Sequence, residues 1–102
     1  MPYFVLSYEL VTDYVNRRTP YREQHLRLAK EAHQRGELIL GGAFSEPADR
    51  ALLVFHVPQR SIVEEFAKND PYVTNALVLR WEIRPWTVVI GDQPEVAMAP
   101  KL

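Results

Sequence analysis

Four short stretches of the chain combine aromatic, β-branched and other apolar residues in the way that is typical of β-strands. In the first stretch, alternation places the even-numbered side chains from Phe4 to Leu10 on one face and the odd-numbered ones from Tyr3 to Glu9 on the other. Pro85 in the last stretch indicates a bulge or an edge position. The predicted strands are residues 3–10, 37–44, 50–57 and 78–90.

A loop and then an amphipathic helix are expected after the first strand. Residues 11–18 are polar and irregular, which is typical of a loop. Thr19 is a suitable N-cap with Pro20 at the first helical position, and Gly36 is a typical helix stop. Between them, side chains of one stripe recur at helical spacing, namely Tyr21, His25, Leu28, Ala29 and Ala32.

A second helix is predicted between the third and fourth strands. Ser61 and Glu64 have the spacing of a capping box, with Ser61 as the N-cap. The helix is expected to end near Asn69, because Asp70 precedes Pro71 and a residue before proline avoids the helical region. Residues 71–76 are long enough for one more short turn of helix.

The predicted order of elements is strand, helix, strand, strand, helix, strand. This is the ferredoxin-like βαββαβ pattern of an α+β protein, in which a four-stranded antiparallel sheet carries both helices on one face. Both faces of the first strand are at least half apolar, so the face without helices requires another cover. We therefore expect a homodimer in which the open sheet faces of two copies pack together. Residues 1–90 form the domain in this prediction, and residues 91–102 form an extended or mobile tail.

Composition restricts the classes of function. A chain of 102 residues has one small core, so an enclosed pocket is expected to need a wall from a second copy. Twelve Lys and Arg oppose 13 Asp and Glu, which leaves no basic excess for binding nucleic acid. The absence of cysteine removes disulfides and a thiol nucleophile. The sequence has no signal-peptide pattern and no apolar run near the roughly 20 residues that span a membrane, so a cytoplasmic location without a membrane partner is expected.

His25 and Asp70 are the main candidates for catalysis. His25 lies in the apolar stripe of the first helix, where burial and neighbours can set its pKa, although a histidine that only packs the helix is the alternative. Asp70 precedes Pro71 and is therefore a good N-cap, but a carboxylate has about four acceptor sites and can orient a histidine at the same time. A His–Asp pair is a competent general base near neutral pH.

Four further residues are candidates for contact with a substrate. Arg22 lies one helical turn before the histidine and is placed to orient an anion, or else it is a solvated cation. Ser45 follows Gly41-Gly42, where the strand either forms a β-bulge or leaves room for a ligand against the backbone. Tyr72 and Trp86 are the aromatic candidates, and Trp86 either walls a pocket or fills a core.

No metal or cofactor site is predicted. His25 and His33 are eight residues apart, which does not match the four-residue spacing of helical metal ligands. Glycine-rich phosphate loops and the nucleophile motif of serine hydrolases are also missing from the sequence. We therefore expect a protein that works without a cofactor; a haem-binding relative with His25 on the iron is a weaker alternative.

At these positions the chain resembles the YciI-like (YCII) family. The resemblance implies a ferredoxin-like fold within a dimeric α+β barrel, as in muconolactone isomerases. It also implies a catalytic pair formed by a histidine in the first helix and an aspartate in the Asp-Pro-Tyr segment, which correspond to His25 and Asp70. It covers roughly residues 3–90 and rests on the segments Arg22-Glu23-Gln24-His25-Leu26, Gly36-Glu37-Leu38, Gly41-Gly42-Ala43-Phe44, Asn69-Asp70-Pro71-Tyr72 and Glu82-Ile83-Arg84-Pro85-Trp86.

The resemblance implies a class of reaction rather than a substrate. Most members of the family have no assigned reaction, and one branch removes HCl from a chlorinated hydroxyhydroquinone. We therefore expect a small enzyme for elimination or isomerisation of a polar or aromatic metabolite, with His25 as general acid or base and Asp70 orienting it. The alternative is a non-catalytic dimeric module that binds a metabolite or a partner.

Overall fold

Helices and strands follow one another in the predicted βαββαβ order, with the predicted short turn from Pro71 present and two further short helical elements added before the first long helix. The computed structural model describes residues 1–91 of the chain. The predicted tail, residues 91–102, lies outside the described residues except for Gly91, and the domain boundary at residue 90 stays a prediction. The elements are β1 (Tyr3–Leu10), α1 (Tyr14–Arg17), the 3-10 helix η1 (Thr19–Tyr21), α2 (Arg22–Gln34), β2 (Leu38–Ala43), β3 (Arg50–His56), α3 (Arg60–Asn69), α4 (Pro71–Thr74) and β4 (Val78–Trp86).

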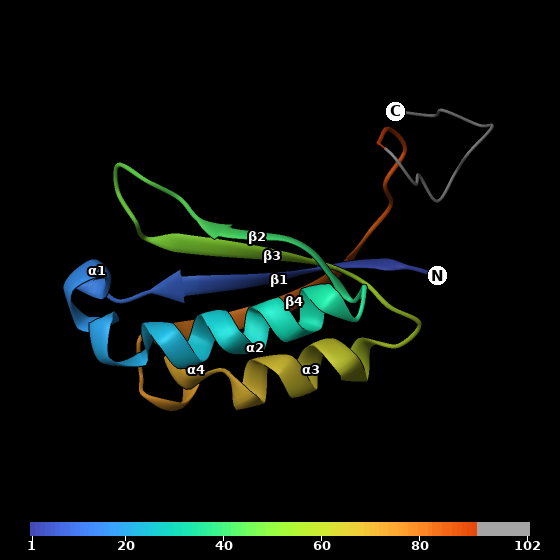
Figure 1. Cartoon of the computed structure of the whole chain (residues 1–102). Helices are drawn as coiled ribbons and strands as arrows, with labels where there is room; N and C mark the ends of the chain where they lie inside the picture. The colour runs from blue at the N-terminus through green and yellow to red at the C-terminus, as the bar shows by residue number, and fades with distance from the viewer. Residues whose placement is uncertain (92–102) are drawn as a thin grey trace.

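The four strands form one antiparallel sheet in the order β2-β3-β1-β4. Helices α2, α3 and α4 all lie on one side of this sheet, and no helix of residues 1–91 covers the other side (Figure 1). The ferredoxin-like fold predicted from the sequence is therefore confirmed. Leu6 on β1 stands opposite Leu53 on β3 and Ile83 on β4, so the inward-facing side chains of three strands form one layer under the helices.

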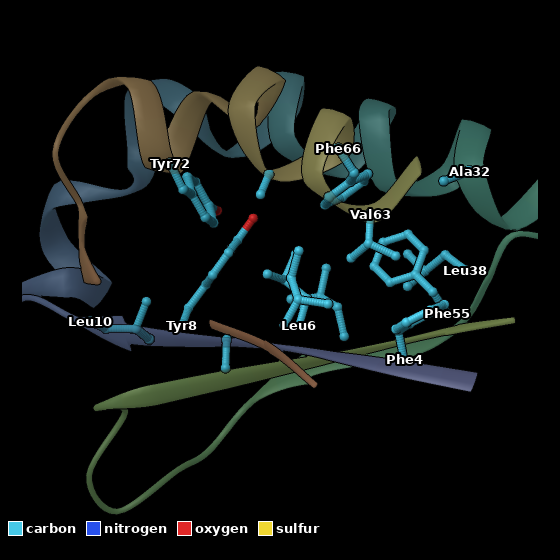
Figure 2. Packing of buried hydrophobic residues seen from close by; sticks show 14 of the residues in the cluster. Phe4, Leu6, Tyr8, Leu10, Ala32, Leu38, Phe55, Val63, Phe66 and Tyr72 are labelled. Carbon is cyan, nitrogen blue, oxygen red and sulfur yellow. The ribbon is translucent and has the colours of Figure 1, made fainter. Parts of the chain in front are cut away.

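The core lies between the sheet and the helices (Figure 2). On β1, alternation works as predicted, because Leu6 and Tyr8 are buried while Val5 and Ser7 on the opposite face are only partly covered. Val63 packs into this core from the helix side, on α3. Burying such side chains removes apolar surface from water, which stabilises the fold by about 25 cal/mol per Å². None of the helices formed by residues 1–91 is long and apolar enough to cross a membrane.

The first helix begins differently from the prediction. Residues 11–18 are not a simple loop, because Tyr14–Arg17 forms the short helix α1. Thr19 is not an N-cap; it begins η1, and its hydroxyl donates to the carbonyl of Asn16. The backbone N–H of Arg22, at the start of α2, donates to the carbonyl of Thr19 in the 3-10 turn. This hydrogen bond takes the place of a side-chain cap.

Two other predicted boundaries are wrong. Helix α3 begins at Arg60 with Gln59 as its N-cap, so Ser61 lies inside the first turn and forms no capping box. Strand β4 ends at Trp86 instead of residue 90, because Trp86 already pairs with Tyr3 at the start of β1. The predicted stop of α2 at Gly36 is confirmed, since Gly36 has a φ of 79°, which a residue without Cβ adopts at little cost.

Candidate active site

His25 and Asp70 meet on the helix-covered side of the sheet. The apolar stripe of α2 turns His25 toward the junction of α3 and α4, where Asp70 lies. Nδ1 of His25 stands 2.8 Å from Oδ1 of Asp70. The histidine side chain is 15% exposed and the aspartate side chain 0% exposed, so the pair is largely screened from water.

Asp70 accepts hydrogen bonds from three different elements. Besides His25, the backbone N–H of Tyr72 donates to Oδ1 at 2.9 Å, and the hydroxyl of Tyr8 donates to Oδ2 at 2.7 Å. Asp70 therefore caps α4 and orients the histidine at once, as its number of acceptor sites allows. Because the carboxylate accepts from Nδ1–H, the lone pair of the imidazole lies on Nε2. Nε2 has no hydrogen-bond partner among residues 1–91.

Tyr8 is the member of this cluster that the sequence did not reveal. It stands on β1 with its ring in the core, and its hydroxyl points up toward the α4 segment that carries Tyr72 (Figure 2). Burial raises the pKa of the Tyr8 phenol, and the neighbouring Asp70 charge raises it further. Tyr8 therefore stays a neutral donor to Asp70 throughout the neutral range. The one signal in the sequence was a hydroxyl group on the apolar face of the first strand.

Tyr72 forms the wall behind the imidazole. Its ring stacks on the His25 ring with the centroids 3.8 Å apart and an angle of 10° between the planes. Its hydroxyl is buried and lacks a hydrogen bond of ordinary geometry within residues 1–91. Burial and the nearby Tyr14 raise the pKa of Tyr72 to about 12, while Arg22 and Arg18 partly oppose that shift. The phenol is therefore neutral, and its interaction with Tyr14, which contributes to the raised pKa, falls short of a hydrogen bond of ordinary geometry.

A cavity of about 450 Å³ lies beside His25, and we call it the His25 cavity. It runs between α2 and the edge strand β2, and both Arg22 and Tyr72 line it. Of the six residues predicted for the site, the structure thus brings together His25, Asp70, Arg22 and Tyr72. Their roles remain predictions.

Ser45 and Trp86 lie elsewhere. Ser45 is exposed in the turn between β2 and β3 and does not line the His25 cavity. Trp86 is 49% exposed and, together with Phe44, lines a second cavity of about 780 Å³ on the opposite face of the sheet, which we call the open-face cavity. Trp86 therefore walls a cavity rather than filling the core of its own chain.

Gly41 and Gly42 separate the two cavities. They do not form the bulge, because the register of β2 shifts between Leu38 and Leu40. Gly41 stands opposite the buried Leu53 and therefore faces the His25 cavity, whereas Gly42 faces the open side. A Cβ on Gly42 would meet nothing within 4 Å, and one on Gly41 would make ordinary contact with Leu53 at 3.5 Å. Packing within residues 1–91 does not require glycine at either position.

The described residues contain no group of three His, Cys, Asp or Glu side chains that is placed to hold a metal ion. His33, the second histidine beside the cavity, has its Nδ1 at 2.7 Å from the carbonyl oxygen of Leu38 and so links the end of α2 to β2.

Comparison with known proteins places the chain in a family and supports the fold. The YCII-related domain matches residues 1–87. The solved structure of 5-chloro-2-hydroxyhydroquinone dehydrochlorinase from Burkholderia phenoliruptrix AC1100, in complex with 2,5-dihydroxybenzoquinone, matches with a TM-score of 0.72 and 15% identity over 84% of this chain and 94% of that chain. An antibiotic biosynthesis monooxygenase matches with a TM-score of 0.52 and 12% identity over 88% of this chain and 100% of that chain. No curated protein sequence matches significantly. At these identities the two structures show a shared fold.

Proposed function

We propose that this chain, which belongs to the family of YCII-related domains, is a small enzyme that uses His25 as general acid and base. Asp70 orients the imidazole, and the substrate is a small polar or aromatic metabolite that undergoes elimination or isomerisation. The observation that carries the proposal is the 2.8 Å contact between Nδ1 of His25 and Oδ1 of Asp70 beside the His25 cavity. A general base must stand within hydrogen-bond reach of the proton it takes, and this cavity gives a substrate access to Nε2.

The surroundings of the pair favour proton transfer over simple packing. Asp70 is fully buried and holds one negative charge next to the ring, so it stabilises the imidazolium that forms when His25 takes a proton. The stacked ring of Tyr72 restricts rotation of the imidazole. Asp70 also caps α4 and accepts from Tyr8, so its burial has a structural use, and it is the contact with a histidine beside a cavity that favours a role in proton transfer.

Removal of HCl from a chlorinated hydroxyquinol is the first reaction to test, because the dehydrochlorinase with the same fold performs it. Two O–H bonds and the C–Cl bond break, and one C–H bond forms. One proton returns to the carbon that carried chlorine, the other leaves with chloride, and the product is a quinone. The reaction needs no oxidant. It needs one group that both accepts and returns a proton in a site screened from water, which is what His25 offers.

The open face of the sheet supports the homodimer as part of the proposal. Leu40, Phe44 and Trp86 on or beside the open-face cavity are 71%, 48% and 49% exposed. A monomer rarely leaves such a connected apolar surface in water. Packing against the same face of a second copy would bury it around a two-fold axis.

Turnover by the wild type and by His25→Gln tests the function. The substrates are 5-chlorohydroxyquinol and its unchlorinated parent, and the measurements are chloride release and quinone absorbance. We expect wild type to release chloride and His25→Gln to be slower by about 10²–10⁴-fold, the range of general acid–base catalysis. Arg27→Gln on the outer side of α2 is the matched control, because Arg27 contacts only Glu23 there. Equal rates for wild type and His25→Gln would reject the catalytic role and favour a binding module.

A further inference from the structure

The His25 cavity is lined by cations that have no anionic partner. Arg18, Arg22 and Lys30 line it, and no aspartate or glutamate of residues 1–91 does. The whole chain has one more acid than bases, so this local excess is not a consequence of composition. Asp70 is the nearest buried acid, and it lies behind His25 with its contacts to His25, Tyr8 and Tyr72.

Two cations near the cavity form ion pairs, whereas the three that line it form none in the described part of the chain. Arg27 on α2 pairs with Glu23, and Arg35 just after α2 pairs with Glu37. None of the three cavity cations forms an ion pair within residues 1–91. Other cations, such as Arg17 and Arg84, also form no ion pair with the described residues, so the cavity is distinguished by three cations that line it without any acid from that part of the chain.

Arg18 is held there by an aromatic ring rather than by an acid. Its guanidinium carbon lies 5.2 Å from the centre of the Tyr14 ring, and the Tyr14 ring packs edge-on against Tyr72 at 5.6 Å. A cation–π contact of this kind fixes the guanidinium without neutralising it or using its N–H donors. Arg22 reaches the same region from one helical turn before His25. Arg22 and Tyr72 both line the cavity.

The Tyr72 hydroxyl supplies an independent reason to expect a ligand. It is buried, its interaction with Tyr14 falls short of a hydrogen bond of ordinary geometry, and Tyr72 lines the cavity. A buried donor without a well-formed hydrogen bond destabilises the protein, and an acceptor oxygen in the cavity would remove that cost. An anionic oxygen satisfies the hydroxyl and the unpaired guanidinium groups together.

We propose that the His25 cavity binds a small organic anion whose carboxylate or ionised phenol lies between Arg18 and Arg22 and accepts from Tyr72. The inference rests on the proposed function, because it names the class of substrate for the same site. The apolar part of the ligand lies along β2, where Gly41 has no side chain and leaves the backbone open to the cavity. This arrangement places the ligand beside Nε2 of His25.

Binding of charged and neutral probes tests the inference without turnover. Benzoate and 4-nitrophenolate carry the two anionic groups, and benzamide is the neutral counterpart of benzoate. In NMR titrations of the full chain we expect benzoate to bind about tenfold tighter than benzamide, because hydrogen bonds to charged groups are the stronger ones. High salt should reduce that difference, since Arg22 is exposed. Tighter binding of benzoate would identify a carboxylate as the preferred group, and tighter binding of 4-nitrophenolate would identify an ionised phenol.

The variants locate the anion. Arg18→Gln and Arg22→Gln should each weaken benzoate binding by about five- to tenfold and leave benzamide unchanged. Tyr72→Phe should weaken it by about threefold, because it removes the hydroxyl and retains the stacked ring. Arg27→Gln should change neither probe. Equal affinities for benzoate and benzamide, or an equal loss in Arg27→Gln, would overturn the proposal.

The same titration separates this inference from the proposed function. His25→Gln should still bind benzoate, because the arginines hold the charged group. Suppose that the wild type binds benzoate more tightly than benzamide, and that the arginine variants lose this difference, but that turnover does not depend on His25. The enzyme proposal then fails and the anion site stands. If turnover depends on His25 but charge makes no difference to binding, the anion site fails and the enzyme proposal stands.

Discussion

The helix-covered face and the open face of the sheet each carry a cavity, and their chemistry differs. The His25 cavity is backed by Asp70, a carboxylate with no exposure and three hydrogen bonds. The open-face cavity contains two charged residues, Glu82 and Arg84, among mainly apolar side chains such as Val54 and Trp86. The helix-covered face holds buried polar groups in a fixed geometry, whereas the open face exposes a mainly apolar surface.

This difference separates the two tasks that we propose for the 102-residue chain, proton transfer and association. Proton transfer requires groups held in one geometry, and three elements of the same chain hold Asp70. Association requires complementary apolar area, which the open strands provide without any buried acid. Substitutions on the covered face should therefore change rate and folding, and substitutions on the open face should change assembly.

Asp70→Asn should have the largest effect, on the covered face. The variant loses the charge that stabilises the imidazolium, so turnover should fall by about 10²–10⁴-fold. An amide also cannot accept from all three donors, and the free energy of unfolding should fall by about 1–3 kcal/mol. Turnover assays and urea unfolding measure the two effects. Asp13→Asn is the control, because Asp13 contacts Asn16 at the surface; a similar loss there would contradict the assignment.

Val54→Lys should have the next largest effect, on the open face. Val54 faces outward from the central strand β3 and lines the open-face cavity, so a lysine there would place an unpaired charge between two packed sheets. We expect a loss of about 2–5 kcal/mol in the free energy of association, seen as a monomer by sedimentation velocity. Leu79→Lys is the matched control, since Leu79 is 65% exposed and does not line that cavity. A wild-type monomer would remove the proposed role of this face.

Tyr8→Phe should have an intermediate effect that depends on pH. At neutral pH, Asp70 loses one donor, which should lower the free energy of unfolding by about 1–3 kcal/mol. Burial raises the Tyr8 pKa above its ordinary value of 10.0, so the folded chain keeps a proton that the unfolded chain releases. The stability is full below about pH 10 and falls above it, by up to about 1.4 kcal/mol per pH unit for each such tyrosine.

Urea unfolding between pH 7 and pH 11 measures this dependence. Above about pH 10 the decline should be shallower in Tyr8→Phe than in the wild type, because one of the groups that release a proton on unfolding is gone. Tyr72, whose pKa is raised to about 12, should cause part of the decline that remains. Identical slopes in the two proteins would show that Tyr8 does not keep its proton in the folded state.

The sequence predicted the fold because hydrophobic alternation and helix stops are local signals. Residues 3–10 form β1 as predicted, and Gly36 ends α2, because each depends on its own neighbours. The errors have two sources. The end of β4 is set by a distant contact, the pairing of Trp86 with Tyr3 at the start of β1. The start of α2 is set by a local 3-10 turn that the spacing of apolar residues did not reveal.

The sequence predicted those site residues that helical spacing or the family motifs indicate. His25 and Asp70 are 45 positions apart, and their contact follows from the family resemblance and the fold together. Tyr8 could not be assigned, because a tyrosine on an apolar strand face usually packs a core and nothing local shows what its hydroxyl reaches. Arg18 was missed for a related reason: its contact with Tyr14 depends on α1, which the sequence pattern did not reveal.

The smallest predicted effects come from Gly41→Ala and Gly42→Ala, two adjacent methyl groups on opposite faces. Neither position has a positive φ, and neither Cβ would clash, so both variants should fold. Alanine restricts the unfolded chain more than glycine does, so each should gain about 0.5–1 kcal/mol in the free energy of unfolding. The methyl of Gly41→Ala enters the His25 cavity, where it should raise KM about two- to fourfold, which corresponds to about 0.8 kcal/mol, the value of one buried CH₂, or less. The methyl of Gly42→Ala lies on the open face, where the proposed second copy packs, so it should leave KM unchanged and alter the dimer dissociation constant by a similar factor. If both variants changed KM equally, the glycine pair would not divide a catalytic face from an association face.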